Sequence, residues 1–140
     1  MFLLKLKVLG IFIFCFTSIV YSAWELSLSK TVEKVEVGNT NLVIPGALIT
    51  YKIIYSNLGD EASNVIIYDK IPDNTSYYTN YSGTASGWIV EFAHINSPNQ
   101  AYGSSDYDIT NTNVTWVRFR KEIVTVSESN LSLYVGVIIN

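Results

Sequence analysis

Residues 47–56 read ALITYKIIYS and decide the fold class of this chain. Large apolar or aromatic side chains take every second position, and mostly polar ones lie between them. The apolar set is Ile49, Tyr51, Ile53 and Tyr55. Alternate residues share one face of an extended strand, so this segment has one apolar face and one polar face. The pattern predicts a half-buried antiparallel β-strand.

Similar segments lie on both sides of this one and extend the prediction to the rest of the chain. They cover residues 24–37, 65–68, 88–93, 114–119 and 131–139. Turn-forming residues separate them, including Gly38–Asn41, Ile44–Gly46 and Ile71–Asn74, and no segment after Ala23 keeps a helical period for three turns. The sequence therefore predicts an all-β fold, an immunoglobulin-like antiparallel β-sandwich of about seven strands.

Two irregular features are expected within this pattern. The alternation in residues 24–37 changes phase near Lys34, which predicts a bend or a β-bulge there. Residues 96–106 combine Pro, Gly, Ser and Asn without any period, and we expect them to form a surface loop.

The first 23 residues differ from the rest and are typical of a secretory signal. Lys5 and Lys7 precede an apolar run from Val8 to Val20, and Ser22-Ala23 offers small residues for cleavage. We expect a cleaved signal peptide at 1–23 and a single domain at 24–140, with a retained membrane anchor as the alternative. Phe12-Ile13-Phe14, and not small residues, precede Cys15, so lipid attachment is not expected.

Residues 24–140 carry seven basic and twelve acidic side chains and no cysteine, which gives a net charge of −5. A nucleic-acid-binding domain would be basic. Disulfides and thiolate metal sites are excluded within these residues. We expect a secreted or extracytoplasmic protein, at the cell surface or in the periplasm.

Several short motifs occur in a fixed order along the predicted domain. They are Leu28-Ser29-Lys30-Thr31, Pro45-Gly46-Ala47 before Ile49-Thr50-Tyr51, Tyr55-Ser56-Asn57-Leu58-Gly59, Ala62-Ser63-Asn64-Val65 before Asp69-Lys70-Ile71-Pro72, and Val114-Thr115-Trp116. Together they resemble the conserved repeat domain called domain of unknown function eleven, of bacterial and archaeal surface proteins. The resemblance covers roughly Leu26 to Ile139. It implies an extracytoplasmic sandwich with a structural or adhesive role and no catalytic residues.

The motif residues have structural roles in this interpretation. They are Lys30, Pro45, Gly46, Tyr51, Asn57, Gly59, Asp69, Pro72 and Trp116. Pro45 and Gly46 turn the chain into the next strand. Asn57 and Gly59 are expected to leave that strand through a left-handed position, and Asp69 to cap the turn at Pro72-Asp73.

The chain departs from the family in two ways. It holds one copy of a domain that is usually repeated, and Thr125–Ser129 replaces a Pro-Gly turn that commonly precedes the last strand. These differences favour a free-standing small secreted or envelope protein over a cell-wall spacer.

Catalytic and metal-binding patterns are weak. His94 is the only histidine, and no serine lies in a nucleophile-elbow pattern, so we expect no enzyme and no cofactor. Asp106 and Asp108 offer two hard oxygens, whereas Ca²⁺ needs six to eight, so a solvated acidic loop is the favoured interpretation.

Aromatic residues are the main candidates for binding. Tyr77, Tyr78, Tyr81 and Trp88 could stack on sugar rings or anchor an interface, with Tyr102 and Tyr107 nearby. For Trp88 and Trp116, core packing between the sheets is the favoured interpretation, whereas the role of the tyrosines stays open.

Two further hypotheses concern charged residues. Arg118 and Arg120 are expected on the outer face of one strand, where they discourage edge pairing or contact an anion. Lys30, Asp69 and Asn140 have the residue types and the order of an isopeptide bond between a first-strand lysine and a last-strand asparagine, with a buried acid nearby.

The leading interpretation is a non-enzymatic structural or adhesive module of the cell envelope or surface that contacts other envelope or surface proteins. The alternative is a carbohydrate- or ligand-binding sandwich that uses the central tyrosines, with glycans as partners. Neither interpretation includes nucleic acid, and the membrane enters only through the export signal.

Overall fold

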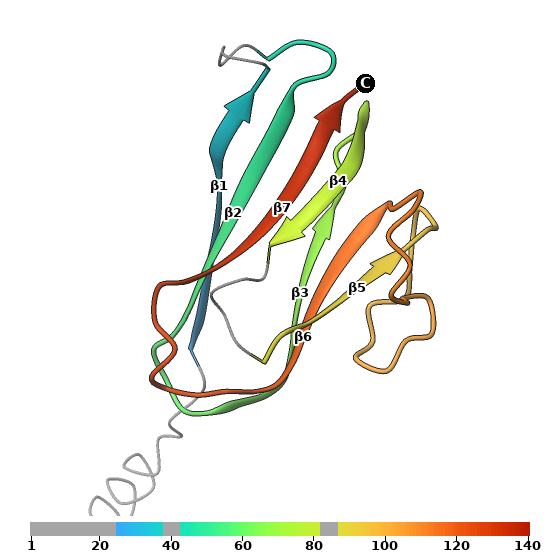
Figure 1. Cartoon of the computed structure of the whole chain (residues 1–140). Coiled ribbons are helices and arrows are strands. Elements are labelled where there is room, and N and C mark those ends of the chain that lie inside the picture. The colour runs from blue at the N-terminus through green and yellow to red at the C-terminus, as the bar shows by residue number, and fades with distance from the viewer. Residues whose placement is uncertain (1–24, 38–42, 82–86) are drawn as a thin grey trace, which may run out of the picture.

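The computed structural model describes residues 25–37, 43–81 and 87–140, which form two antiparallel β-sheets packed face to face (Figure 1). The strands are β1 (Leu26–Glu36), β2 (Leu48–Asn57), β3 (Ala62–Lys70), β4 (Thr75–Tyr81), β5 (Ile89–Ala93), β6 (Trp116–Val124) and β7 (Leu131–Ile139). The predicted all-β sandwich of about seven strands is confirmed. In the described part of the chain, no helix is long and apolar enough to cross a membrane.

One strand was not expected. β4 contains Tyr77 and Tyr78 in succession, and its pairing with β7 shifts register between Tyr77 and Thr79. This irregularity removes the two-residue period by which a strand is found in a sequence.

The strand order places β1 and β3 at edges of the two sheets. One sheet has the order β1-β2-β7-β4, and the other has the order β3-β6-β5. In the immunoglobulin constant-type order, the fifth strand lies between the second and fourth, and the seventh lies beside the sixth. Here β7 and β5 have exchanged these places, so the chain keeps the sandwich architecture with a different connection of its last strands.

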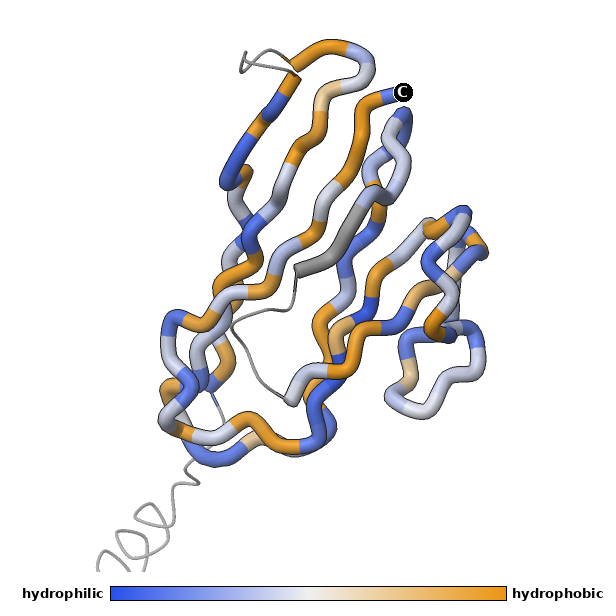
Figure 2. Tube along the Cα trace, in the orientation of Figure 1, coloured by the Kyte–Doolittle hydropathy of each residue, from blue (hydrophilic) through white to orange (hydrophobic). Residues whose placement is uncertain are grey.

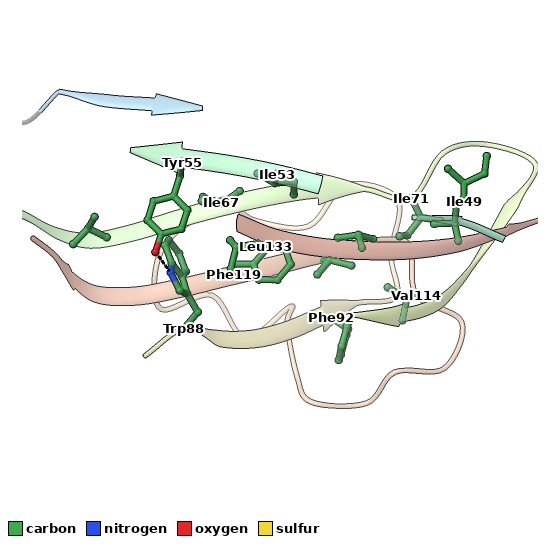
Figure 3. Packing of buried hydrophobic residues seen from close by; sticks show 14 residues of the cluster. Ile49, Ile53, Tyr55, Ile67, Ile71, Trp88, Phe92, Val114, Phe119 and Leu133 are labelled. Carbon is green, nitrogen blue, oxygen red and sulfur yellow. Dashed lines mark hydrogen bonds between the residues drawn. The ribbon is translucent and has the colours of Figure 1, made fainter. Parts of the chain in front are cut away.

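The core fills the space between the sheets with one apolar face from each (Figure 3). Ile49, Ile53 and Tyr55 of β2 face inward, as the alternation predicted, and Val117 and Phe119 of β6 meet them. Apolar and polar positions alternate along several strands in Figure 2, which is the pattern of sheets with one buried face. Burial of these side chains from water is the main stabilising contribution, because the described residues hold no disulfide.

The expected bulge is present in β1. Pairing with β2 shifts between Val32 and Lys34, so Glu33 is the extra residue. The extra residue restores the phase, and Val35 packs against the core at the far end of the strand from Leu26. The turn at Pro45-Gly46 is also confirmed, with Gly46 at a φ of 85°. The predicted turn at Gly38–Asn41 and the predicted signal peptide lie outside the described residues.

A long connection covers the outer face of the β3-β6-β5 sheet. Residues 94–115 join β5 to β6 as an irregular loop, seen beside β5 in Figure 1. The loop pairs with the edge of β5 through Phe92 and Asp108, and the hydroxyl of Tyr68 donates to the carbonyl of Gln100. The β3-β6-β5 sheet is therefore buried on both faces over part of its area.

Candidate functional site

An ion pair connects the two sheets along the side of the sandwich bounded by β1 and β3. Lys30 lies opposite Ile53, and Asp69 lies opposite Val117, so both charged side chains face the interior. Lys30 Nζ lies 2.5 Å from Asp69 Oδ1. The same Nζ lies 4.2 Å from the ring centre of Tyr51, a cation–π distance. We call these residues, with Leu28 and Val32, the β1–β3 side.

Asp69 is the more buried partner of this pair. Its side chain is 9% exposed, against 34% for Lys30, and its Oδ2 has no hydrogen-bond partner among the described residues. Burial raises the pKa of Asp69, against the opposing effect of the Lys30 ammonium. Burial also raises the pKa of Tyr51, and the charge of Asp69 adds to that effect. Lys30 is therefore the group that makes an ionised carboxylate tolerable here.

Two apolar side chains of β1 remain exposed although they point toward the interior. Leu28 and Val32 lie opposite Tyr55 and Tyr51 in the register with β2, yet they are 59% and 55% exposed. The β3-β6-β5 sheet therefore does not cover this part of β1. An edge strand with uncovered apolar residues is a typical site of strand pairing with another chain.

The second half of β1 is protected against such pairing and the first half is not. Besides the bulge, the second half carries ion pairs between Lys34 and Glu36 at 2.6 Å and between Glu33 and Lys52 at 3.6 Å. Charges and bulges on an edge strand oppose sheet extension. Between Leu26 and Val32 the only charge is Lys30, which is turned toward Asp69.

A second charged cluster lies under the 94–115 loop. Arg118 is only 2% exposed, and its guanidinium contacts Glu91 at 2.8 Å and the carbonyls of Ala101 and Ser104. Its Cζ lies 4.0 Å from the ring centre of Tyr107. Burial raises the pKa of Tyr107 to about 12. The prediction that Arg118 lies exposed on the outer face of its strand is therefore wrong, because the loop covers that face.

Arg120 completes this cluster at its margin. It contacts Glu91 at 3.1 Å, and its Cζ lies 5.0 Å from the ring centre of Tyr102. One carboxylate thus serves two guanidinium groups, and two tyrosine rings lie over them. The arrangement fixes the loop and leaves Arg118 unavailable to an anion from solution.

A third polar cluster is buried at the end of the sheets where β5 begins and β6 ends. Trp88 Nε1 donates to the Tyr55 hydroxyl at 2.8 Å, as drawn in Figure 3, and that hydroxyl donates to Glu128 Oε2 at 2.8 Å. Lys121 Nζ lies 2.7 Å from the same oxygen, and the Thr125 amide donates to Oε1. Burial and Glu128 raise the pKa of Tyr55 to about 12. Burial would raise the pKa of Glu128, but its donors outweigh burial and lower it.

The aromatic residues expected to bind a ligand do not form one surface. Trp88 is 8% exposed in the core, and Tyr77 packs its ring 5.1 Å from that of Phe92. Tyr78 faces the other way and is 56% exposed. The side chain of Tyr81 lies outside the described part of the structure. The expected ligand surface is thus reduced to Tyr78 among the described side chains, because Tyr77 lies opposite the buried Val137 and faces inward with it.

The acidic loop residues act as acceptors within the loop. Asp106 accepts from the Asn99 amide, and Asp108 accepts from the Thr110 amide at 2.6 Å and lies 3.2 Å from His94 Nε2. The Thr110 amide and then His94 lower the pKa of Asp108. No group of three or more His, Cys, Asp or Glu residues suited to a metal ion occurs in the described part of the chain.

Two of the expected turn roles are wrong. Neither Asn57 nor Gly59 has a positive φ; the Asn57 side chain instead holds the turn, with Oδ1 accepting from the Gly59 amide and Nδ2 donating to Asp60 and Val124 carbonyls. Asp69 does not cap the turn after Pro72, because it faces Lys30. The hydroxyl of Thr75 donates to the Pro72 carbonyl there.

Trp116 and Pro72 lie near one another at the end of the sandwich where β3 finishes. Trp116 Nε1 donates to the Asn96 carbonyl at 3.1 Å. Pro72 lines an open pocket together with Asn74, Asn96 and Thr115. The charged residues of its lining, Lys70 and Asp73, pair with each other at 3.2 Å.

The residues proposed for an isopeptide bond are only partly brought together. Lys30 meets Asp69, but Lys30 lies opposite Ile53, which lies opposite Leu133 of β7. Asn140 follows seven positions after Leu133, which is roughly 23 Å along a strand. Its amide donates to Asn74, and its Oδ1 accepts from Ser76. The proposed partner of Lys30 is therefore out of reach.

Comparison with known proteins finds no matching family model, curated protein or solved structure. The resemblance to the conserved repeat domain stays a prediction. The site is consequently argued from its own geometry.

Sequence reasoning missed Leu28 and Val32. They were assigned to the strand without a role, because alternation identifies an inward-facing residue but not whether the opposite sheet covers it. No sequence pattern marks them, since Leu26 and Val35 on either side of them pack against the core.

Proposed function

We propose that this protein is a non-enzymatic module of the cell envelope or surface that acts by protein–protein contact through its β1–β3 side. The observation that supports this most is the exposure of Leu28 and Val32 on the unprotected half of an edge strand. An edge strand offers unpaired backbone donors and acceptors, and neighbouring apolar side chains add burial when a partner strand joins.

The ion pair makes this side suited to the role. Lys30 and Asp69 tie β1 to the opposite sheet, so the edge is presented as a fixed strand. A preorganised edge loses less conformational entropy on binding than a mobile one. The polar pair between two apolar residues also opposes nonspecific aggregation.

Glycan binding by the tyrosines has less support, since Trp88 is buried, Tyr77 is partly buried against the core, and Tyr78 is separated from them. A catalytic role also has less support, since the His94–Asp108 pair lies at the surface and Asp108 accepts from the Thr110 amide within its own loop.

A position-specific photocrosslink in the cells that produce the protein tests this proposal. A photoreactive phenylalanine analogue at Leu28 or Val32 should give defined protein adducts, whereas the same analogue at Ile95 or Ile109, which are also exposed but lie in the 94–115 loop, should not. Protease treatment of intact cells then places the adduct on the outer surface or behind a membrane. Equal labelling at all four positions, or none at Leu28 and Val32, would refute the proposal.

A further inference from the structure

We propose that the strand received by β1 is β1 of a second copy of this chain, paired antiparallel about a two-fold axis at Ser29. This inference rests on the proposed contact role of the β1–β3 side and names its partner. The argument comes from the length of the free segment and from the residues that self-pairing would place opposite one another.

The unprotected part of β1 is a segment symmetric about Ser29. It begins with the first strand residue, Leu26, and ends at Val32, the last residue before the bulge. In an antiparallel pair with a two-fold axis at residue 29, Leu26 lies opposite Val32 and Ser27 lies opposite Thr31 of the other copy. The pairing thus uses the whole regular segment and stops where the bulge begins.

The side chains brought together are compatible on both faces of the extended sheet. On the outer face, Ser27, Ser29 and Thr31 form a row of hydroxyl groups, and cross-strand pairs of this type are favourable. On the inner face, Leu28 of one copy lies beside Lys30 of the other, and the exposed Leu28 and Val32 of both copies become neighbours. The aliphatic part of Lys30 supplies apolar surface, because its ammonium is held by Asp69.

Other registers are less favourable. An axis at Lys30 would place two lysines opposite each other, and like charges in that position destabilise a strand pair. An axis at Leu28 would leave Thr31 and Val32 unpaired. An axis at Thr31 would place Leu28 opposite Lys34, beyond the bulge. The axis at Ser29 gives the longest pairing without a charge conflict.

A seam of seven residues is small beside the roughly 1,600 Å² that a standard interface buries. We therefore expect weak, reversible association with a Kd of about tens of micromolar, which sedimentation velocity detects. Such an association suits assembly at a surface, where the local concentration of the chain is high.

Cysteine crosslinking of the full-length chain carrying Cys15→Ser tests the register. Ser29→Cys should form a disulfide-linked dimer readily, because residues directly opposite in an antiparallel pair have Cα atoms about 4.5–5.5 Å apart. Ser27→Cys alone should crosslink at least about tenfold more slowly, but should crosslink with Thr31→Cys when the two are mixed. Equal rates for Ser27→Cys and Ser29→Cys would overturn the proposed axis.

A charge substitution tests the association itself. Leu28→Lys places a lysine opposite Lys30 twice in the dimer and should weaken it at least about tenfold, since two like-charge contacts are added. Ile109→Lys, at an exposed residue of the 94–115 loop beside β5, should leave it unchanged. A chain that stays monomeric at these concentrations, while Leu28 crosslinks in cells to a different protein, would overturn self-pairing and leave the contact role standing. No adduct at Leu28 would refute both.

Discussion

The ammonium of Lys30 and the carboxylate of Asp69 lie 2.5 Å apart and join the edge strands of the two sheets. The two residues are 39 positions apart in the chain and belong to different sheets. Their contact fixes the side of the sandwich on which Leu28 and Val32 are exposed. The stability of this side therefore depends on one buried carboxylate and its one charged partner.

Replacing Lys30 with Met should lower the free energy of unfolding at neutral pH by about 1–2 kcal/mol. Removing one partner of a fully buried pair costs about 3–5 kcal/mol. We expect a smaller loss here because Lys30 is partly exposed to solvent. Chemical denaturation measures the change. Lys34→Met is the matched control, because the Lys34–Glu36 pair is exposed and should contribute little.

Lys30→Met should also change the pH dependence of the free energy of unfolding. The pKa of Asp69 is raised by folding, so the folded state holds its proton more tightly than the unfolded state does. The contribution of Asp69 to stability is then most favourable at low pH and falls as pH rises from the unfolded value of 3.8 through the folded pKa. Lys30→Met should steepen this fall, and an Asp69→Asn background should abolish it. A slope that is the same with and without Lys30 would contradict the role of the pair.

The intact mass of the protein should show no loss of ammonia. An isopeptide bond from Lys30 to Asn140 would release one ammonia, but β7 carries Asn140 seven positions beyond the row of Lys30. Mass spectrometry of the purified chain, before and after denaturation, measures whether the intact mass lacks one ammonia. A species lighter by one ammonia would show that these two residues meet, against the strand register found here.

The sequence predicts local features of this fold well. The strand at β2 and the bulge in β1 follow from alternation, because both depend on residues close together in the chain. β4 was missed because its own bulge interrupts that alternation near Tyr78. Local patterns therefore identify strands in proportion to their regularity.

The contacts that define the candidate site depend on distant residues and could not be predicted in the same way. Asp69 was expected to cap a nearby turn, and it pairs with Lys30 across the sheets instead. Arg118 was expected on an exposed face, which it would occupy without the 94–115 loop. Both errors arise because a two-residue period gives the face of a residue but not what covers that face.

Replacing Glu128 with Gln should lower the free energy of unfolding by about 1–2 kcal/mol above pH 5. The substitution removes the charge that accepts from Lys121, Tyr55 and the Thr125 amide. Folding lowers the pKa of Glu128, so its contribution is complete above its unfolded value of 4.5 and is lost as pH falls through the folded pKa. Between those values the unfolded state binds more protons at this residue, so the contribution of Glu128 to stability rises with pH.

Denaturant melts at several acidic pH values test this assignment. The wild-type protein should lose its advantage over Glu128→Gln as the pH falls below 4.5, until the two stabilities converge. Glu122→Gln, at an exposed position on β6, is the control and should follow the wild-type curve. A constant difference between wild type and Glu128→Gln throughout this range would show that the lost contact is steric and not electrostatic.

Replacing Arg118 with Met should release the 94–115 loop while the two sheets remain folded. Arg118 holds this loop through the carbonyls of Ala101 and Ser104 and through the ring of Tyr107, and it neutralises Glu91 beneath it. Losing a buried partner of Glu91 should cost about 3 kcal/mol, although Arg120 retains its two hydrogen bonds to that carboxylate. Hydrogen exchange should therefore accelerate most at the Ser104, Asp108 and Thr110 amides and little in β2 and β7. Arg120→Met, which removes the more exposed guanidinium, should produce a smaller change in the same segment, and equal effects from the two variants would contradict the central role of Arg118.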